Sequence, residues 1–155
     1  MEQDKHIVKS YDDEMKEINN NILDIGSLVE DQLKRALIAL KNQDSQLADR
    51  VTEDDNLIDE KFRELDQNLV LIFGKRQPMA TDLRTIFSAI KMNKDLERLG
   101  DHATNIAKRI AMIELVLPEK PVRDILRMGE HVQVMVGKVI QSFVKNRKLV
   151  PEDLH

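Results

Sequence analysis

Two pairs of acidic residues stand four positions apart, each in a segment whose apolar spacing predicts an α-helix. Asp55 and Asp59 form the first pair, and Glu97 and Asp101 form the second. This spacing places both members of a pair on one ridge of a helix, where like charges repel unless a cation compensates them. Carboxylate oxygens suit hard ions, so the four residues are predicted to bind magnesium, manganese or iron, as one ion or as a cluster.

Chance alone also produces such pairs on solvated helix faces, because the chain has 28 acidic residues. Position argues against chance here. Asp55 occupies the apolar stripe of its own helix, between Val51 and Ile58. Glu97 and Asp101 share a ridge beside the apolar seam of theirs. The spacing therefore favours a metal site over a purely solvated face.

Other site chemistries find little support in the residues. The absence of cysteine excludes disulfides, thiolate zinc sites and cysteine nucleophiles. A catalytic di-iron bundle needs Glu-x-x-His pairs on two helices, and the single pair present runs from Glu152 to His155. No phosphate loop or nucleophile elbow occurs. We expect a binding protein and not an enzyme; a carboxylate-bridged metal enzyme and a purely structural helical scaffold are the alternatives.

Composition limits the partners and the fold. A net charge of -4 gives the chain no electrostatic reason to bind nucleic acid. Its longest apolar run, residues 69–73, is far shorter than the roughly 20 residues that span a bilayer. With 34% charged and 3% aromatic residues, the chain suits long amphipathic helices and not a β-sandwich. We expect a cytoplasmic, all-α protein.

Apolar residues recur in steps of three and four along four segments, which predicts an antiparallel bundle of long helices. Asp44 or Ser45 is a plausible N-cap of the second helix, and Gly74 is its predicted C′ residue. Pro78 suits the first turn of the third helix, whose seam is predicted to run to Leu117. The four predicted helices cover residues 7–42, 45–73, 78–117 and 122–147.

The fourth predicted helix repeats the pattern of the first. When Gly26 is aligned with Gly129, Leu33 matches Val136 and Leu37 matches Ile140 without a gap. Any two amphipathic helices can be slid into some register, so this match alone is compatible with chance.

Two longer motifs go beyond spacing. Residues 76–84 read RQPMATDLR and residues 95–107 read DLERLGDHATNIA. In this order the motifs resemble those of the PhoU family of phosphate-specific transport regulators, with Leu99 in place of the usual isoleucine. The resemblance covers nearly the whole chain and implies a fold of two similar three-helix bundles. Residues 1–117 would form the first repeat, and residues 118–155 the first helix of a second, incomplete repeat.

The same resemblance implies a site and a function. In that family E(D)xxxD motifs hold metal clusters in some members; Glu97 with Asp101, and Asp55 with Asp59, match those motifs. A family member of this kind would regulate phosphate uptake and phosphate-starvation signalling negatively, acting on transcription of the Pho regulon indirectly. Its implied partners are the phosphate-transporter ATPase and a sensor histidine kinase. It would associate with the membrane only through these partners.

Self-association is a further expectation. The fourth helix carries a long apolar face, and the two helices that would cover it in a complete second bundle are absent from this sequence. An exposed apolar surface of that size is rare in water. We expect a homodimer through this helix; folding of the helix back onto the first bundle is the alternative.

Overall fold

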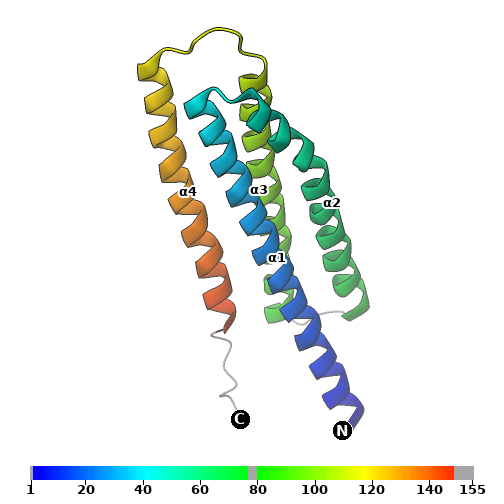
Figure 1. The fold of residues 1–155 in the computed structure, drawn as a ribbon. Coiled ribbons are helices and arrows are strands. Elements are labelled where there is room, and N and C mark those ends of the chain that lie inside the picture. Colours follow the sequence, from blue (N-terminus) through cyan, green and yellow to red (C-terminus); the bar gives the residue numbers. More distant parts are fainter. Residues whose placement is uncertain (1, 77–79, 149–155) are drawn as a thin grey trace.

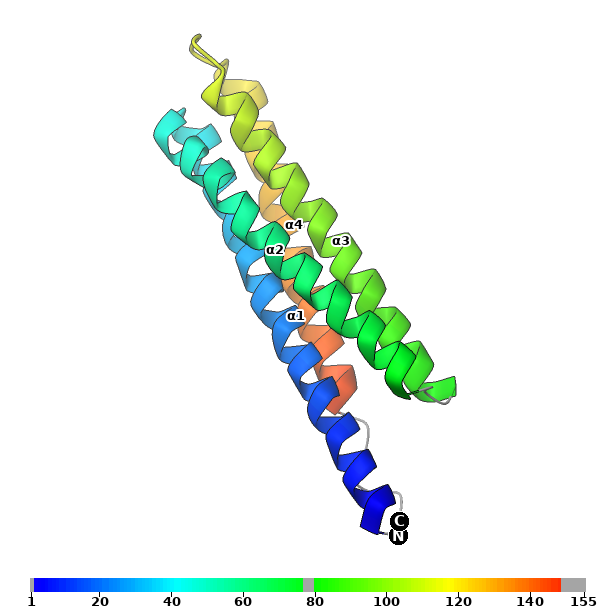
Figure 2. The same ribbon diagram turned by 90° about the vertical axis from the view of Figure 1, so that its right-hand side faces the viewer.

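Four long helices, each antiparallel to the next, make up the described part of the chain (Figure 1). The computed structural model describes residues 2–76 and 80–148. The helices are α1 (Glu2–Asn42), α2 (Ser45–Arg76), α3 (Ala80–Ala111) and α4 (Glu119–Lys148). The second view shows a slender rod (Figure 2). Because these residues contain no strand, the predicted all-α bundle is confirmed. None of the described helices is apolar over a long enough stretch to cross a bilayer.

Helices α1, α2 and α3 enclose the main hydrophobic core. The predicted stripes of α1 and α2 face inward, whereas the seam of α3 is divided. Leu96, Ala103 and Ile110 are buried, but Met92 and Leu99 are only half-buried. The seam of α3 therefore turns partly away from the core and toward α4. The largest fully buried apolar side chains are those of Ile18, Ile22, Val29, Val51, Leu65, Leu69 and Ile86.

A tight turn joins α1 to α2. Gln43 adopts a positive φ of 47°, and the backbone N–H of Asp44 donates to the carbonyl of Ala39 at 3.0 Å, which closes α1 as a Schellman motif does. The Asp44 Oδ1 then accepts a hydrogen bond from the backbone N–H of Leu47 at 2.9 Å. Asp44 is therefore the N-cap of α2, one of the two residues that the sequence suggests for that position.

Two of the predicted C-terminal helix ends are wrong. Gly74 lies inside α2, which continues to Arg76, and no glycine among the described residues has a positive φ. The α3 seam was predicted to reach Leu117, but α3 ends at Ala111. Its last buried layer, at Ile110, lies level with the α1–α2 turn, so a longer helix would have no core to cover. The predicted turn at Gln77–Pro78 lies outside the described residues.

The position of Gly74 leads to a stability prediction. An added Cβ there would meet no atom within 4 Å, and alanine is better than glycine in a helix interior. Gly74→Ala should therefore stabilise the protein by about 0.5–1 kcal/mol. Urea unfolding followed by circular dichroism measures this change. A lower midpoint in the variant would mean that Gly74 has a role that the fold does not reveal.

Helix α4 folds back along α1 of the same chain (Figure 1). The contact is close at two glycines: Gly26 of α1 lies against Ile140, and Gly129 of α4 lies against Leu37. These are the residues that the repeat register pairs, since Gly26 matches Gly129 and Leu37 matches Ile140. Each helix thus contributes one glycine and one large aliphatic residue to the same contact. This symmetric packing supports the repeat register.

The connection before α4 is fixed to the first turn of the bundle. The side-chain amide of Gln43 donates to the carbonyl of Leu115 at 2.9 Å and accepts from the backbone N–H of Leu117 at 3.0 Å. These bonds set where α4 begins beside the end of α1. The predicted boundary between residues 1–117 and 118–155 falls in this connection; the division itself stays a prediction, and residues 149–155 lie outside the described part.

Candidate metal centre

Three of the four predicted ligands come together on one face of the bundle. Asp55 and Asp59 are half-buried on α2, and Asp101 is exposed on α3. Each offers a carboxylate oxygen, and the three oxygens lie within 4.8 Å of one another. The four-residue spacing puts the two α2 carboxylates on one ridge, and the antiparallel packing of α2 and α3 brings Asp101 to the same height. We refer to Asp55, Asp59 and Asp101 as the acidic patch.

Glu97, the fourth predicted ligand, is not part of this group. It lies one turn before Asp101 on α3, and its Oε2 is 2.9 Å from the Nζ of Lys94 on the same helix. Lys94 also contacts Asp66 Oδ2 on α2 at 2.9 Å, so one ammonium joins the two helices. The hydrogen bonds that Lys94 donates to Asp66 and Glu97 raise the pKa of Lys94. Glu97 therefore lies beside the acidic patch and neutralises the positive charge of Lys94.

A buried polar layer lies beneath the acidic patch. The hydroxyl of Thr104 on α3 donates to Asp55 Oδ1 at 2.8 Å. The side-chain amide of Gln32 on α1 lies 3.3 Å from the same oxygen and 3.3 Å from Thr104 Oγ1. Gln32 and Thr104 are both buried. One oxygen of Asp55 is therefore held by donors from the other two helices, which fixes the orientation of the carboxylate.

Gly100 leaves room for this layer, because a Cβ at that position would lie 3.0 Å from Gln32 Oε1. That oxygen is buried and has no hydrogen-bond partner among the described residues. Sequence reasoning did not identify Gln32 or Thr104 as site residues. A signal existed for Gln32, which sits on the apolar face of α1, three residues after Val29 and four before Ala36.

The donor chemistry of the acidic patch fits a hard cation. Its ligand atoms are carboxylate oxygens, which Mg²⁺, Mn²⁺ and iron accept and which soft metals do not favour. His102, next to Asp101 in sequence, is exposed and is not in the group. Burial, followed by the charges of Asp55, Asp101 and Glu97, raises the pKa of Asp59 above its ordinary value of 3.8, and Arg63 opposes this only in part. A bound cation would reverse that repulsion.

The raised pKa of Asp59 makes the metal-free protein sensitive to pH. The folded state holds the Asp59 proton more tightly than the unfolded state does. Near neutrality the ionised Asp59 therefore destabilises the fold. This destabilisation is relieved as the pH falls through the folded pKa of Asp59 toward 3.8. Asp59→Asn should therefore raise the melting temperature near pH 7 and flatten its rise on mild acidification. Melting curves in a chelator from about pH 4.5, near the ordinary carboxylate pKa, to about pH 7.5, well above it, measure this; parallel curves for both proteins would contradict it.

Comparison with known proteins identifies the family. Residues 22–110 match the family model described as the PhoU domain. The chain is 35% identical to the phosphate-specific transport system accessory protein PhoU homolog of Rhizobium meliloti (strain 1021), over 89% of this chain and 59% of that protein. It is 37% identical to the phosphate-specific transport system accessory protein PhoU of Serratia marcescens, over 91% of this chain and 58% of that protein.

A solved structure agrees with these matches. The crystal structure of PhoU from Pseudomonas aeruginosa superposes with a TM-score of 0.83 at 35% identity, over 87% of this chain and 65% of that one. The chain spans little more than half the length of the sequence relatives. The matched model covers the second half of α1, all of α2 and nearly all of α3, and so includes the acidic patch and the layer beneath it. The chain belongs to the PhoU domain family.

Proposed function

We propose that the chain is an accessory regulator of phosphate-specific transport. The observation that carries this proposal is the family match over residues 22–110, together with relatives whose names describe accessory proteins of that transport system. The regulator would keep phosphate uptake and the phosphate-starvation response low when phosphate is plentiful. It would do so in the cytoplasm by contacting the transporter ATPase and a sensor histidine kinase, with an indirect effect on transcription.

Metal binding at the acidic patch belongs to the same proposal. Three converging carboxylates and the raised pKa of Asp59 support it. Asp55, Asp59 and Asp101 would hold the ion, and Gln32 and Thr104 would orient Asp55. The ion would neutralise the mutual repulsion of the carboxylates and tie α2 to α3. The proposal also includes self-association of the chain. A dimer would present two copies of each partner-binding face.

Affinity capture tests the partners. The tagged 155-residue chain is expressed in cells grown at high and at low phosphate, and captured proteins are identified by mass spectrometry. Enrichment of a phosphate-transporter ATPase and a sensor histidine kinase, stronger at high phosphate, is the expected result. A variant with Asp55, Asp59 and Asp101 all changed to asparagine serves as the matched control for the acidic patch. Absence of both partners under both conditions would contradict the regulatory proposal.

Metal analysis distinguishes a regulator from a metal enzyme. The purified chain is analysed for bound iron, manganese and magnesium, and the loaded protein is assayed for phosphatase and oxidase turnover. Metal without turnover is the result expected of an adaptor. Turnover that disappears in the triple asparagine variant would overturn the adaptor and favour a carboxylate-bridged enzyme.

A further inference from the structure

The α2–α3 hairpin carries an exposed apolar patch near the point where α2 ends and α3 begins. Val70 and Phe73 of α2 are 64% and 44% exposed, and Phe87 of α3 is 55% exposed. Ile90, one turn after Phe87, is half-buried. Their exposed apolar area is on the order of 300 Å², the size of surface patches that often have a function. We refer to these four residues as the outer patch.

Two contacts show that the outer patch is one surface and not four isolated side chains. The rings of Phe73 and Phe87 meet edge to face, with centroids 6.0 Å apart and an interplanar angle of 60°. Val70 and Ile90 line one open groove between the helices, with a volume of about 530 Å³. Residues three apart are neighbours on a helix, so Val70 adjoins Phe73 and Ile90 adjoins Phe87.

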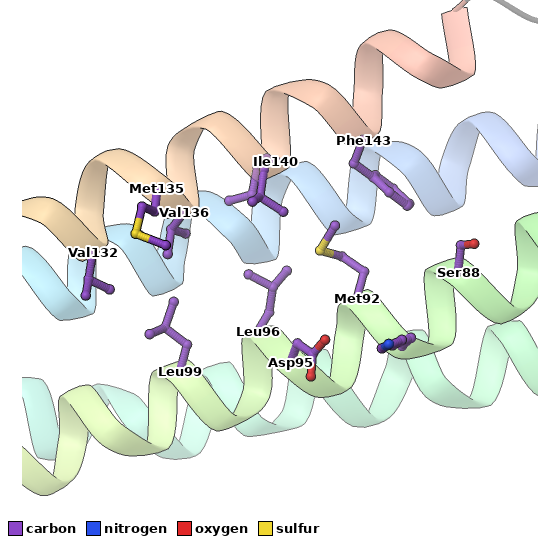
Figure 3. A pocket seen from close by; sticks show the side chains of 12 residues that line it. Ser88, Met92, Asp95, Leu96, Leu99, Val132, Met135, Val136, Ile140 and Phe143 are labelled. Carbon is purple, nitrogen blue, oxygen red and sulfur yellow. The ribbon is translucent and has the colours of Figure 1, made fainter.

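The outer patch is separate from the other two faces of α3. One face enters the core, where Ile86 is fully buried. The second points toward α4: Met92 and Leu99 are directed across an open groove of about 470 Å³ (Figure 3). Phe87 and Ile90 lie on a third face, which borders α2. A molecule bound at the outer patch would therefore leave the core and the α1–α4 contact undisturbed.

The outer patch has a cationic rim on the side away from α2. Arg84 and Lys91 are exposed and lie one heptad apart on a ridge of α3 that flanks Phe87, and Arg98 continues this ridge by another heptad. The described residues provide no ion-pair partner for these three side chains. The nearest exposed carboxylate on α3, Asp95, lines the groove toward α4. The rim is therefore free to pair with carboxylates of another molecule.

These features match an amphipathic helix with an acidic flank. A groove between two helices accepts the apolar ridge of a third helix. Carboxylates seven residues apart on that helix would face Arg84 and Lys91, while its apolar ridge covers the outer patch. Interfaces are enriched in aromatic residues and arginine, and two of the chain's four phenylalanines lie in this patch.

A membrane or a nucleic acid matches the same surface less well. Asp59 lies two heptads before Phe73, and Asp101 lies two heptads after Phe87. The acidic patch is thus on the same face as the outer patch, about 21 Å along the rod. A long anionic surface would extend over these carboxylates and be repelled. A helix of about three turns would end before them, at more than a Debye length of about 8–10 Å.

We propose that the outer patch docks an amphipathic helix of a partner protein, with acidic residues along one flank of that helix. The inference rests on the proposed function, whose partners are the transporter ATPase and the sensor histidine kinase. It names the surface that one of these two proteins contacts.

Two exposed apolar residues of α2 provide a matched test of the surface. Val70 lies in the outer patch and is 64% exposed; Leu57 lies outside it and is 65% exposed. In the capture experiment at high phosphate, wild type and Leu57→Glu should recover both partners equally. Val70→Glu should recover one partner at least about tenfold less, because it places a carboxylate against the apolar ridge. Circular dichroism checks folding, and Phe87→Ser replaces Val70→Glu if that variant does not fold.

Charge reversal tests the acidic flank. Arg84→Glu together with Lys91→Glu should reduce recovery of the same partner at least about tenfold, because like charges would then face each other. Arg84→Lys together with Lys91→Arg keeps both charges and should keep the partner. Undiminished recovery by the charge-reversed variant would overturn the acidic flank.

A photo-cross-linker identifies the bound segment. p-Benzoylphenylalanine in place of Phe87 keeps an aromatic ring there, and after irradiation of cells the cross-linked peptide is sequenced by mass spectrometry. The expected peptide belongs to the ATPase or the kinase and has carboxylates seven residues apart beside apolar residues. A cross-link to lipid, to nucleic acid, to a second copy of this chain or to a basic segment would overturn the assigned partner helix.

The outcomes separate the surface from the proposed function. A wild type that recovers neither partner would overturn both. Full recovery of both partners by Val70→Glu and Phe87→Ser would overturn the outer patch and leave the regulatory function standing. Loss of the same partner in Leu57→Glu, with its fold intact, would also overturn the patch, because a residue outside it would then matter equally.

Discussion

Asp101→Asn should lower the affinity of the metal-free protein for Mn²⁺ at least about a hundredfold, more than the loss of an outer-shell partner costs in metal sites. Asp101 is the one carboxylate that α3 contributes to the acidic patch, so its removal leaves two ligands on a single helix. Helix content should not change, because Asp101 is exposed and outside the core. Isothermal titration with Mn²⁺ measures the affinity, and circular dichroism measures the helix content.

Glu97→Gln is the matched control, one turn away on the same helix. Because Lys94 holds Glu97, its loss should lower the Mn²⁺ affinity less than tenfold, through the missing charge alone. An equal loss in both variants would mean that Glu97 leaves Lys94 and binds the ion. A wild type that binds no Mn²⁺ at millimolar concentration would refute the metal centre altogether.

Gly129→Ala should behave oppositely to Gly74→Ala, although both replace a helical glycine. A Cβ at Gly129 would lie 2.5 Å from Leu37 Cδ2 and 3.1 Å from Leu37 Cγ, whereas Gly74 faces open space. Overpacking of this kind costs about 1–3 kcal/mol. The gain in helix propensity is the same at both sites, so the free energies of unfolding of the two variants should differ by that amount. Urea unfolding under identical conditions measures the difference.

Two further measurements locate the effect of Gly129→Ala. Amide hydrogen exchange should become faster in α4 and change little in α2, because α4 is held mainly by its contact with α1. Leu37→Ala, although destabilising alone, should cost less in the Gly129→Ala background, since the smaller side chain removes the clash. Equal stabilities of Gly74→Ala and Gly129→Ala would show that α1 and α4 separate without cost.

Much of the fold could be predicted from periodicity. Apolar spacing identifies four helices and the stripes that form the core, because a bundle buries one face of each helix. Local signals were weaker at the ends: Gly74 is a typical C′ residue, yet α2 continues past it. The end of α3 at Ala111 depends on where the α1–α2 turn lies in space, which periodicity within α3 does not encode.

The acidic patch shows a similar limit. Spacing placed Asp55 with Asp59, and Glu97 with Asp101, on common ridges, and antiparallel packing brought three of them together. Residue spacing could not show that Lys94 pairs with Glu97, because this pairing depends on which of several nearby carboxylates the lysine reaches. Gln32 and Thr104 belong to no pairwise motif; they meet Asp55 only when three helices close around them.

The exchange of roles between Gly26 with Ile140 and Gly129 with Leu37 is the geometry of a symmetric homodimer found inside one polypeptide. A single three-helix repeat that carried this glycine and this leucine could pair with a second copy of itself in the same way. Fusion of two such genes would raise the effective concentration of the halves to the millimolar range without any new contact. Among the described residues, the α1–α4 contact is therefore where the repeat register has its clearest structural counterpart.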